Sequence, residues 1–123
     1  MPPIQHEQTI EAPQADVWRF IVDPAALSAW FGADARLEPE LGAAVRFRFV
    51  DGSERRGAVT EVEPGRRLTW RWRELHGAGL TGLVVGEPSS VTIALRQAGD
   101  AGRTLVTITE TADHPAGAAE ARG

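Results

Sequence analysis

The sequence contains no cysteine and no lysine, so every basic side chain other than histidine is an arginine. The lack of cysteine excludes disulfides, thiolate nucleophiles and cysteine-ligated metals. The lack of lysine excludes Schiff-base chemistry through an amine side chain. No stretch is long and apolar enough to suggest a membrane span, and residues 1–4 are not a basic segment followed by an apolar run. We therefore expect a cytoplasmic protein, and its 123 residues predict a single domain over residues 1–123.

Few residues are candidates for catalysis or for binding a metal or cofactor. The three histidines lie far apart in the sequence, without the spacing of paired metal ligands, and no serine lies in a nucleophile-elbow pattern. A G-x-G-x-x-G string spans residues 77–82, but apolar residues and a proline follow it, where a dinucleotide site needs a helix. Residues 77–82 are therefore predicted to form a glycine-rich loop. For the whole chain, the sequence predicts no metal and no cofactor, and it favours a non-enzymatic protein over an enzyme.

The charges are unevenly distributed along a chain whose net charge is -4. Residues 46–73 hold eight arginines against four acids, and the segments on both sides are acidic. These arginines alternate with apolar residues and do not cluster in a tail or recognition helix, which favours a solvated sheet face over a phosphate-binding surface. The alternative that a few of them turn inward to meet a ligand carboxylate stays open. We expect neither nucleic acid nor a membrane as a partner.

Two short helices are predicted near the N-terminus, followed only by strands. Apolar residues recur at helical spacing over residues 13–22, and Pro13 suits the first turn of a helix. Asp23 precedes a proline and is therefore disfavoured in a helix, so the first helix ends there and Pro24 can begin a second. A strand over residues 4–10 precedes the helices.

From Leu37 onward, alternating polar and apolar runs predict an antiparallel meander. Asp51–Gly52 predicts a two-residue hairpin loop, because both residues tolerate the positive backbone angles that it needs. Pro64–Gly65 predicts a second turn, with proline and glycine at its two central positions. With the N-terminal strand, the sheet has six or seven strands, and the fold class is α+β.

Alternation within two strands places four large aromatic residues on one face of this sheet, opposite four arginines. The aromatic residues are Phe47, Phe49, Trp70 and Trp72, and the arginines are Arg46, Arg48, Arg71 and Arg73. Each aromatic side chain buries about 150–250 Å² when it is covered, so the aromatic face needs a cover. Either the two helices close it as a core, or it lines a ligand pocket.

The strings A-P-Q-A-D-V-W, D-P-A-A-L-S-A-W-F and E-V-E-P-G-R-R-L-T-W-R-W, in this order, resemble the START-like or helix-grip (SRPBCC) superfamily. The nearer branch contains homologues of the activator of the heat-shock chaperone ATPase, alongside polyketide cyclase-like proteins. The resemblance implies a curved antiparallel sheet folded around a helix, with an apolar cavity between them. Members end in a long helix, but residues 112–123 contain no large apolar residue, so we expect that helix to be absent or truncated.

This fold hosts several functions, and three hypotheses remain. The first is binding of a small hydrophobic or aromatic molecule without defined catalysis. The second is a cyclase or dehydratase that uses His76 or Glu61 as its acid/base group, and the third is a co-chaperone-like interaction module in the stress response. The expected pocket residues are Phe31, Phe47, Phe49, Val59, Trp70, Trp72 and Ile93, with Glu61, His76 and Glu110 as its candidate polar residues.

The oligomeric state is predicted from the absent helix. An open grip would leave the aromatic face in water, at a cost that grows with the exposed apolar area. The apolar segment of residues 80–85 or a second copy of the chain would then cover it, which predicts a homodimer or, as the alternative, a chain trimmed of its C-terminal helix. Contact with a chaperone is the other protein partner that the resemblance implies.

Overall fold

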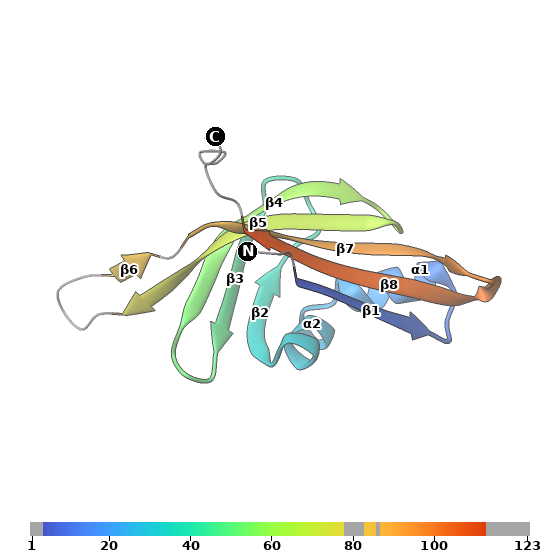
Figure 1. Ribbon diagram of the computed structural model, residues 1–123, viewed down its shortest axis with the longest axis horizontal. Helices are drawn as coiled ribbons and strands as arrows, with labels where there is room; N and C mark the ends of the chain where they lie inside the picture. Colours follow the sequence, from blue (N-terminus) through green and yellow to red (C-terminus); the bar gives the residue numbers. More distant parts are fainter. Residues whose placement is uncertain (1–3, 78–82, 86, 113–123) are drawn as a thin grey trace.

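The computed structural model describes residues 4–77, 83–85 and 87–112. Two helices follow the first strand, and strands make up the rest of the described chain (Figure 1). In chain order the elements are β1 (Ile4–Ile10), α1 (Gln14–Ile21), α2 (Pro24–Phe31), β2 (Ala33–Leu37), β3 (Ala44–Phe49), β4 (Glu54–Glu63), β5 (Arg67–Gly77), β6 (Leu83–Val85), β7 (Ser89–Ala98) and β8 (Asp100–Ala112).

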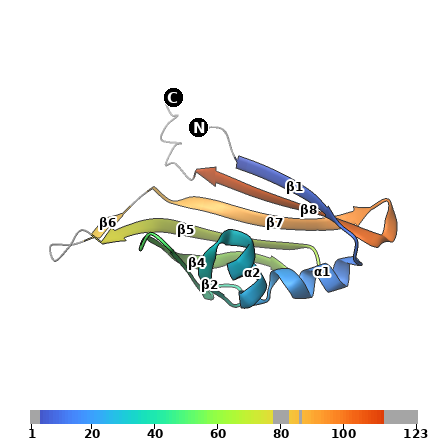
Figure 2. The same ribbon diagram turned by 90° about the horizontal axis from the view of Figure 1, so that it is seen from below.

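All eight strands form one antiparallel sheet, and seven of them follow the order β1-β8-β7-β5-β4-β3-β2. The sheet bends around the two helices, which lie against its concave side (Figures 1 and 2). This confirms the predicted α+β helix-grip fold with its seven-strand path. The three-residue strand β6, which pairs with β5 off this path, lies in a segment that was not predicted to form a strand. The expected absence of a long C-terminal helix concerns residues 113–123, which lie outside the described residues.

The helix boundaries follow from the prolines and one glycine. Pro13 has extended backbone angles at the N-cap of α1, and Asp23 has extended angles before Pro24, the first residue of α2. Gly32 ends α2 in the left-handed conformation, which glycine adopts without steric cost. The predicted pair of short helices is confirmed.

One of the two predicted turns is longer than expected. The Phe49 amide still donates to the Ser53 carbonyl at 2.9 Å, so the hairpin loop between this last backbone pair consists of three residues, 50–52, and Gly52 has a φ of 91°. The two-residue loop was therefore wrong, because the chain forms a three-residue loop whose last residue is a left-handed glycine. The Pro64–Gly65 turn is confirmed: the Arg66 amide donates to the Glu63 carbonyl at 2.8 Å, and Gly65 has a φ of 81°.

The inner face of the sheet carries a packed aromatic core. Phe47 and Trp70 are fully buried, and Trp72 is 3% exposed. Phe31 from α2 covers them, with its ring centroid 5.1 Å from that of Phe47 and 6.0 Å from that of Trp70. The expectation that an open grip leaves this face in water is therefore wrong, because the chain itself buries these three side chains. Their burial gives no argument for a dimer.

Register explains which side chains face inward. Val59 lies opposite Trp70, and Gly57 lies opposite Trp72. A Cβ atom on Gly57 would lie 1.7 Å from the Arg71 carbonyl oxygen, so β4 and β5 approach too closely there for any larger residue. The arginines predicted for the other face are exposed, apart from the partly buried Arg46. The two-faced arrangement is confirmed.

Candidate functional site

A cavity of about 550 Å³ lies between the β1 edge of the sheet and the two helices. Its wall is mostly apolar, with one amide and one carboxylate side chain among the residues that line it. The lining residues are Gln8 and Ile10 of β1, Ala12 between β1 and α1, Asp16, Val17 and Phe20 of α1, and Ala26, Ala29 and Trp30 of α2. The carboxylate of Asp16 forms an ion pair with Arg19 one helical turn away, so this cavity contains no unpaired charge.

The alternation of side chains along β1 and their spacing along α1 determine which residues form this wall. Gln8 and Ile10 lie opposite Val106 and Thr104 of β8, so they are on the inner face of the sheet. In α1, Val17 belongs to the buried core stripe, whereas Phe20 lies beside that stripe and remains 51% exposed. An aromatic ring left half in water is costly, and an apolar molecule in the cavity would remove part of this cost.

The seven expected pocket residues lie elsewhere. Phe47, Val59, Trp70, Trp72 and Ile93 are buried in the core, and Phe31 and Phe49 are partly buried against it. None of the seven lines the cavity. Sequence reasoning did not point to the wall of this cavity, although Phe20 offered a signal because it extends the apolar surface of α1 beyond the face that the core needs.

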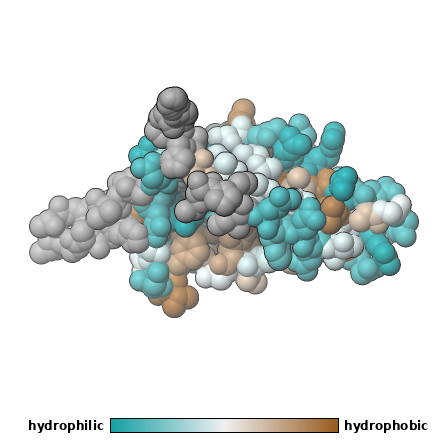
Figure 3. All heavy atoms as spheres, in the orientation of Figure 1, coloured by the Kyte–Doolittle hydropathy of each residue, from teal (hydrophilic) through white to brown (hydrophobic). Residues whose placement is uncertain are grey.

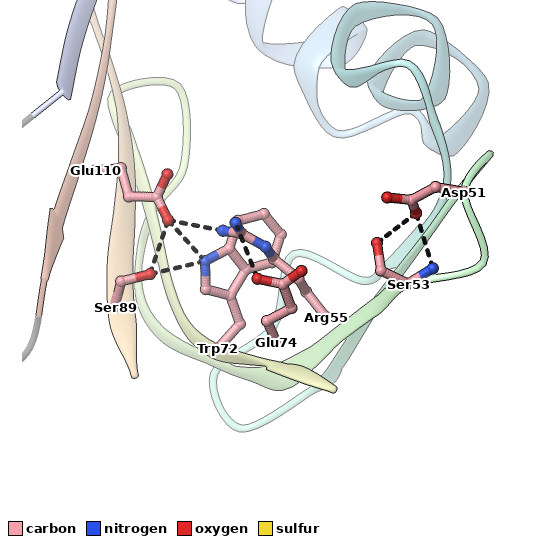
Figure 4. A network of polar contacts seen from close by, with 7 residues as sticks. All are labelled: Asp51, Ser53, Arg55, Trp72, Glu74, Ser89 and Glu110. Atoms are coloured by element: carbon pink, nitrogen blue, oxygen red, sulfur yellow. Dashed lines mark hydrogen bonds and ion pairs between the residues drawn. The ribbon is translucent and has the colours of Figure 1, made fainter. Parts of the chain in front are cut away.

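A polar network lies on the same inner face, toward the other end of β8 (Figure 4). Its centre is Oε2 of Glu110, which accepts hydrogen bonds from Ser89 Oγ at 2.7 Å, Arg55 Nη1 at 2.9 Å and Trp72 Nε1 at 3.2 Å. The Arg55 guanidinium lies 4.9 Å from the Trp72 ring centroid and 3.9 Å from the carboxylate of Glu74. Four strands thus contribute to one cluster.

The network satisfies a buried donor and leaves an acceptor open. The indole N–H of Trp72 would be costly to bury without its partners Ser89 and Glu110. All three donors bind the same oxygen, so Oε1 of Glu110 accepts no hydrogen bond within the described part of the chain. Arg55 and Glu110 are each more than one quarter exposed, so these groups reach solvent. The cluster can therefore accept a hydrogen bond from a molecule on the concave side.

The other two candidate polar residues do not join Glu110. Glu61 lies on the outer face, where it accepts a hydrogen bond from Thr69 at 3.2 Å and pairs with Arg67 at 3.5 Å. His76 pairs with Val84 in the sheet, but its side chain lies outside the described residues. The structure therefore brings no acid/base pair together from these residues.

Within residues 4–77, 83–85 and 87–112, no group of three histidine or acidic side chains could hold a metal ion. None of the helices in these ranges has the length and apolar character needed to cross a bilayer.

A bent antiparallel sheet gripping helices, with an apolar cavity on its concave side, defines the helix-grip class of proteins. Within that class, the family model described as "Activator of Hsp90 ATPase homolog 1-like protein" matches residues 11–123. The chain belongs to this family. No curated protein sequence matches it significantly.

Solved structures agree with the fold. Protein MLL2253 from Mesorhizobium loti superposes with a TM-score of 0.71 at 20% identity, over 98% of this chain and 88% of that one. DynU16, a protein in the dynemicin biosynthetic locus, superposes with a TM-score of 0.69 at 27% identity. This match covers 98% of this chain but only 40% of DynU16. The Aha1 dimer from Colwellia psychrerythraea superposes with a TM-score of 0.65 at 20% identity, over 93% of this chain and 78% of that one.

Proposed function

We propose that the protein binds a small apolar molecule in the cavity between β1 and the two helices, without reacting with it. The observation that carries this proposal is the cavity of about 550 Å³ with its mostly apolar wall. Ligand pockets typically measure about 300–1,000 Å³ and combine apolar walls with a few polar groups. Here the polar groups are Gln8 and the ion-paired Asp16.

The half-exposed ring of Phe20 supports the same conclusion. Apolar surface removed from water contributes about 25 cal/mol per Å², so covering about 100 Å² of this wall would favour binding by roughly 2.5 kcal/mol before entropy costs. A flat or aliphatic molecule without charge fits this chemistry best. We propose that this binding takes place in the cytoplasm.

The cyclase or dehydratase alternative receives less support. Such an enzyme needs an acid/base group within reach of its bound substrate. Glu61 is on the opposite face of the sheet, and Glu110 lies opposite Ile4, four residues along β8 from the position facing Gln8. At about 3.4 Å per residue this separation is roughly 14 Å. Glu110 therefore cannot serve a small molecule held beside Gln8.

A co-chaperone-like contact is the second candidate, and the names of the relatives favour it, because one of the similar structures is an Aha1 dimer. Either a chaperone or a second copy of this chain would then be the partner. The strongly exposed apolar side chains Leu41 and Val50 lie in different turns, and Figure 3 shows hydrophobic residues in several separate places. Scattered apolar residues are normal on a monomer. Light scattering of the purified protein would reveal a dimer.

The experiment that tests ligand binding uses a neutral fluorescent probe, N-phenyl-1-naphthylamine, titrated with protein. Two exposed alanines on α2 give a matched pair of variants, because Ala29 lines the cavity and Ala25 does not. We expect Ala29→Phe to fill the cavity and weaken probe binding by about tenfold, a loss of about 1.4 kcal/mol. Ala25→Phe should stay within about twofold of the unmodified protein. Equal effects of the two substitutions, or no probe binding at all, would contradict the proposal.

A further inference from the structure

Four arginines form a continuous row across the outer face of the sheet. Arg36 of β2 lies directly opposite Arg46 of β3, which lies opposite Arg56 of β4, which lies opposite Arg73 of β5. Three of the four are exposed, and Arg46 is partly buried. Neighbouring strands are about 4.8 Å apart, so the row spans roughly 14 Å.

This arrangement works against the stability of the sheet. Like charges directly opposite each other on neighbouring strands are destabilising, and here three such pairs follow one another. Carboxylates compensate only part of the row: Asp34 pairs with Arg36 at 3.4 Å, and Glu54 pairs with Arg56 at 2.7 Å. Arg46 and Arg73 form no ion pair with any described residue. The row therefore keeps positive charge available to a partner.

The surroundings strengthen the positive charge. Arg48 and Arg71 lie on this face beside the row, so six arginines surround the carboxylates of Asp34, Glu38 and Glu54 on a chain whose net charge is -4. The face is also hollowed. A groove of about 280 Å³ lies over Ala58, whose side chain on this face is small, and Arg56, Arg71 and Arg73 are among the residues that line it. We call the six arginines and this groove the arginine surface.

We propose that the arginine surface docks an acidic, extended segment of a partner protein. Alternate side chains of an extended segment lie about 6.8 Å apart, so three alternate carboxylates cover about 14 Å, the length of the row. Guanidinium groups bind carboxylates through two parallel hydrogen bonds, which suits such a segment. A nucleic acid fits less well, because the net charge of -4 repels a long polyanion and the row offers only about 14 Å of contact. The site is independent of the cavity, which lies on the other side of the sheet.

The test is fluorescence anisotropy with a labelled eight-residue peptide that alternates glutamate and threonine, at about 50 mM salt to limit screening. The variant Arg46→Gln/Arg73→Gln removes the two unpaired charges of the row. Its matched control is Arg66→Gln/Arg96→Gln, which removes two exposed arginines outside the row that also lack ion pairs with described residues. We expect the dissociation constant to rise about fivefold or more in the row variant and less than about twofold in the control. A peptide with glutamine in place of glutamate should not bind.

Three outcomes would overturn the proposal. Equal weakening in both double variants would mean that only net charge matters, and absence of peptide binding would mean that the row is merely solvated. Tighter binding of an eight-nucleotide single-stranded thymidine oligomer, with the same dependence on Arg46 and Arg73, would assign the surface to nucleic acid. Unchanged circular dichroism and unchanged binding of N-phenyl-1-naphthylamine would show that the variants fold and that the cavity is intact.

Discussion

Trp70 gives the sharpest test of whether the inner aromatic residues form a core or a pocket. Its side chain is fully buried, and its ring centroid lies 5.6–6.0 Å from those of Trp72, Phe47 and Phe31. Replacing a packed tryptophan with alanine costs about 3–5 kcal/mol, because it removes buried apolar surface and leaves a cavity. A residue that lines an open pocket loses much less. We therefore expect Trp70→Ala to lower the free energy of unfolding by about 3–5 kcal/mol.

A second substitution at the same position tests the cost of burying the indole N–H group without a hydrogen-bond partner. Trp70 Nε1 is buried and has no hydrogen-bond partner among the described residues, and an unsatisfied buried donor costs about 1–3 kcal/mol. Trp70→Phe removes that donor while it keeps an aromatic ring, so the gain offsets part of the lost packing. We expect its cost to be below about 1.5 kcal/mol.

Urea denaturation followed by circular dichroism measures both variants, with the midpoint and slope compared as for a two-state domain. Phe20→Ala is the control, because Phe20 is half exposed and lines the cavity. We expect that control to cost less than about 1 kcal/mol. If Trp70→Ala cost no more than Phe20→Ala, the assignment of Trp70 to the packed core would be refuted.

Three further predictions concern the sheet and its polar groups. Gly57→Ala should destabilise the protein by more than about 2 kcal/mol in the same denaturation assay, because the new Cβ would lie 1.7 Å from a backbone oxygen of β5. A loss below about 0.5 kcal/mol would contradict this close approach of the two strands. Glu110→Ala should lower the free energy of unfolding by about 1–3 kcal/mol, because it weakens the hydrogen bonding of the buried Trp72 indole. Glu110→Gln should lower it less, because glutamine keeps an acceptor oxygen. Equal losses in the two variants would argue against the network. The hydrogen bond from Arg56 lowers the pKa of Glu54, so this pair stabilises the fold above the pKa of the unfolded carboxyl, and its contribution is lost as the pH falls through the folded pKa. A carboxyl titration followed by NMR should show the Glu54 midpoint rising in Arg56→Gln, and an unmoved midpoint would contradict the assignment of the cause.

Local signals in the sequence were enough to predict the elements of the fold. Proline and glycine placed both helices and the turn at Pro64–Gly65, and alternation assigned the two faces of β3 and β5. The loop after β3 was predicted one residue too short, because Asp51–Gly52 is compatible with two loop lengths and only the pairing of Phe49 with Ser53 decides between them. Strand β6 was missed because three residues are too few for a periodic pattern.

The site was harder to predict because it depends on which surfaces lack a partner. Alternation shows that Phe47 and Trp70 face inward, but not that Phe31 of α2 covers them. The cavity forms where α1 and β1 leave a gap, and the only local signal of it is Phe20, an apolar residue beside the core stripe of α1. The Glu110 network joins residues up to 55 positions apart, and only the strand order brings them together.

The four tryptophans allow the most direct test of the proposed binding site, because Trp30 alone among them lines the cavity. Their indole N–H groups can be followed separately by ¹⁵N–¹H correlation NMR while N-phenyl-1-naphthylamine is added. Binding in the cavity predicts a saturable shift of the Trp30 indole signal, with the signals of the core residues Trp70 and Trp72 nearly unchanged. Shifts of Trp70 and Trp72 with Trp30 unmoved would place the ligand among the inner aromatic residues and contradict the cavity assignment.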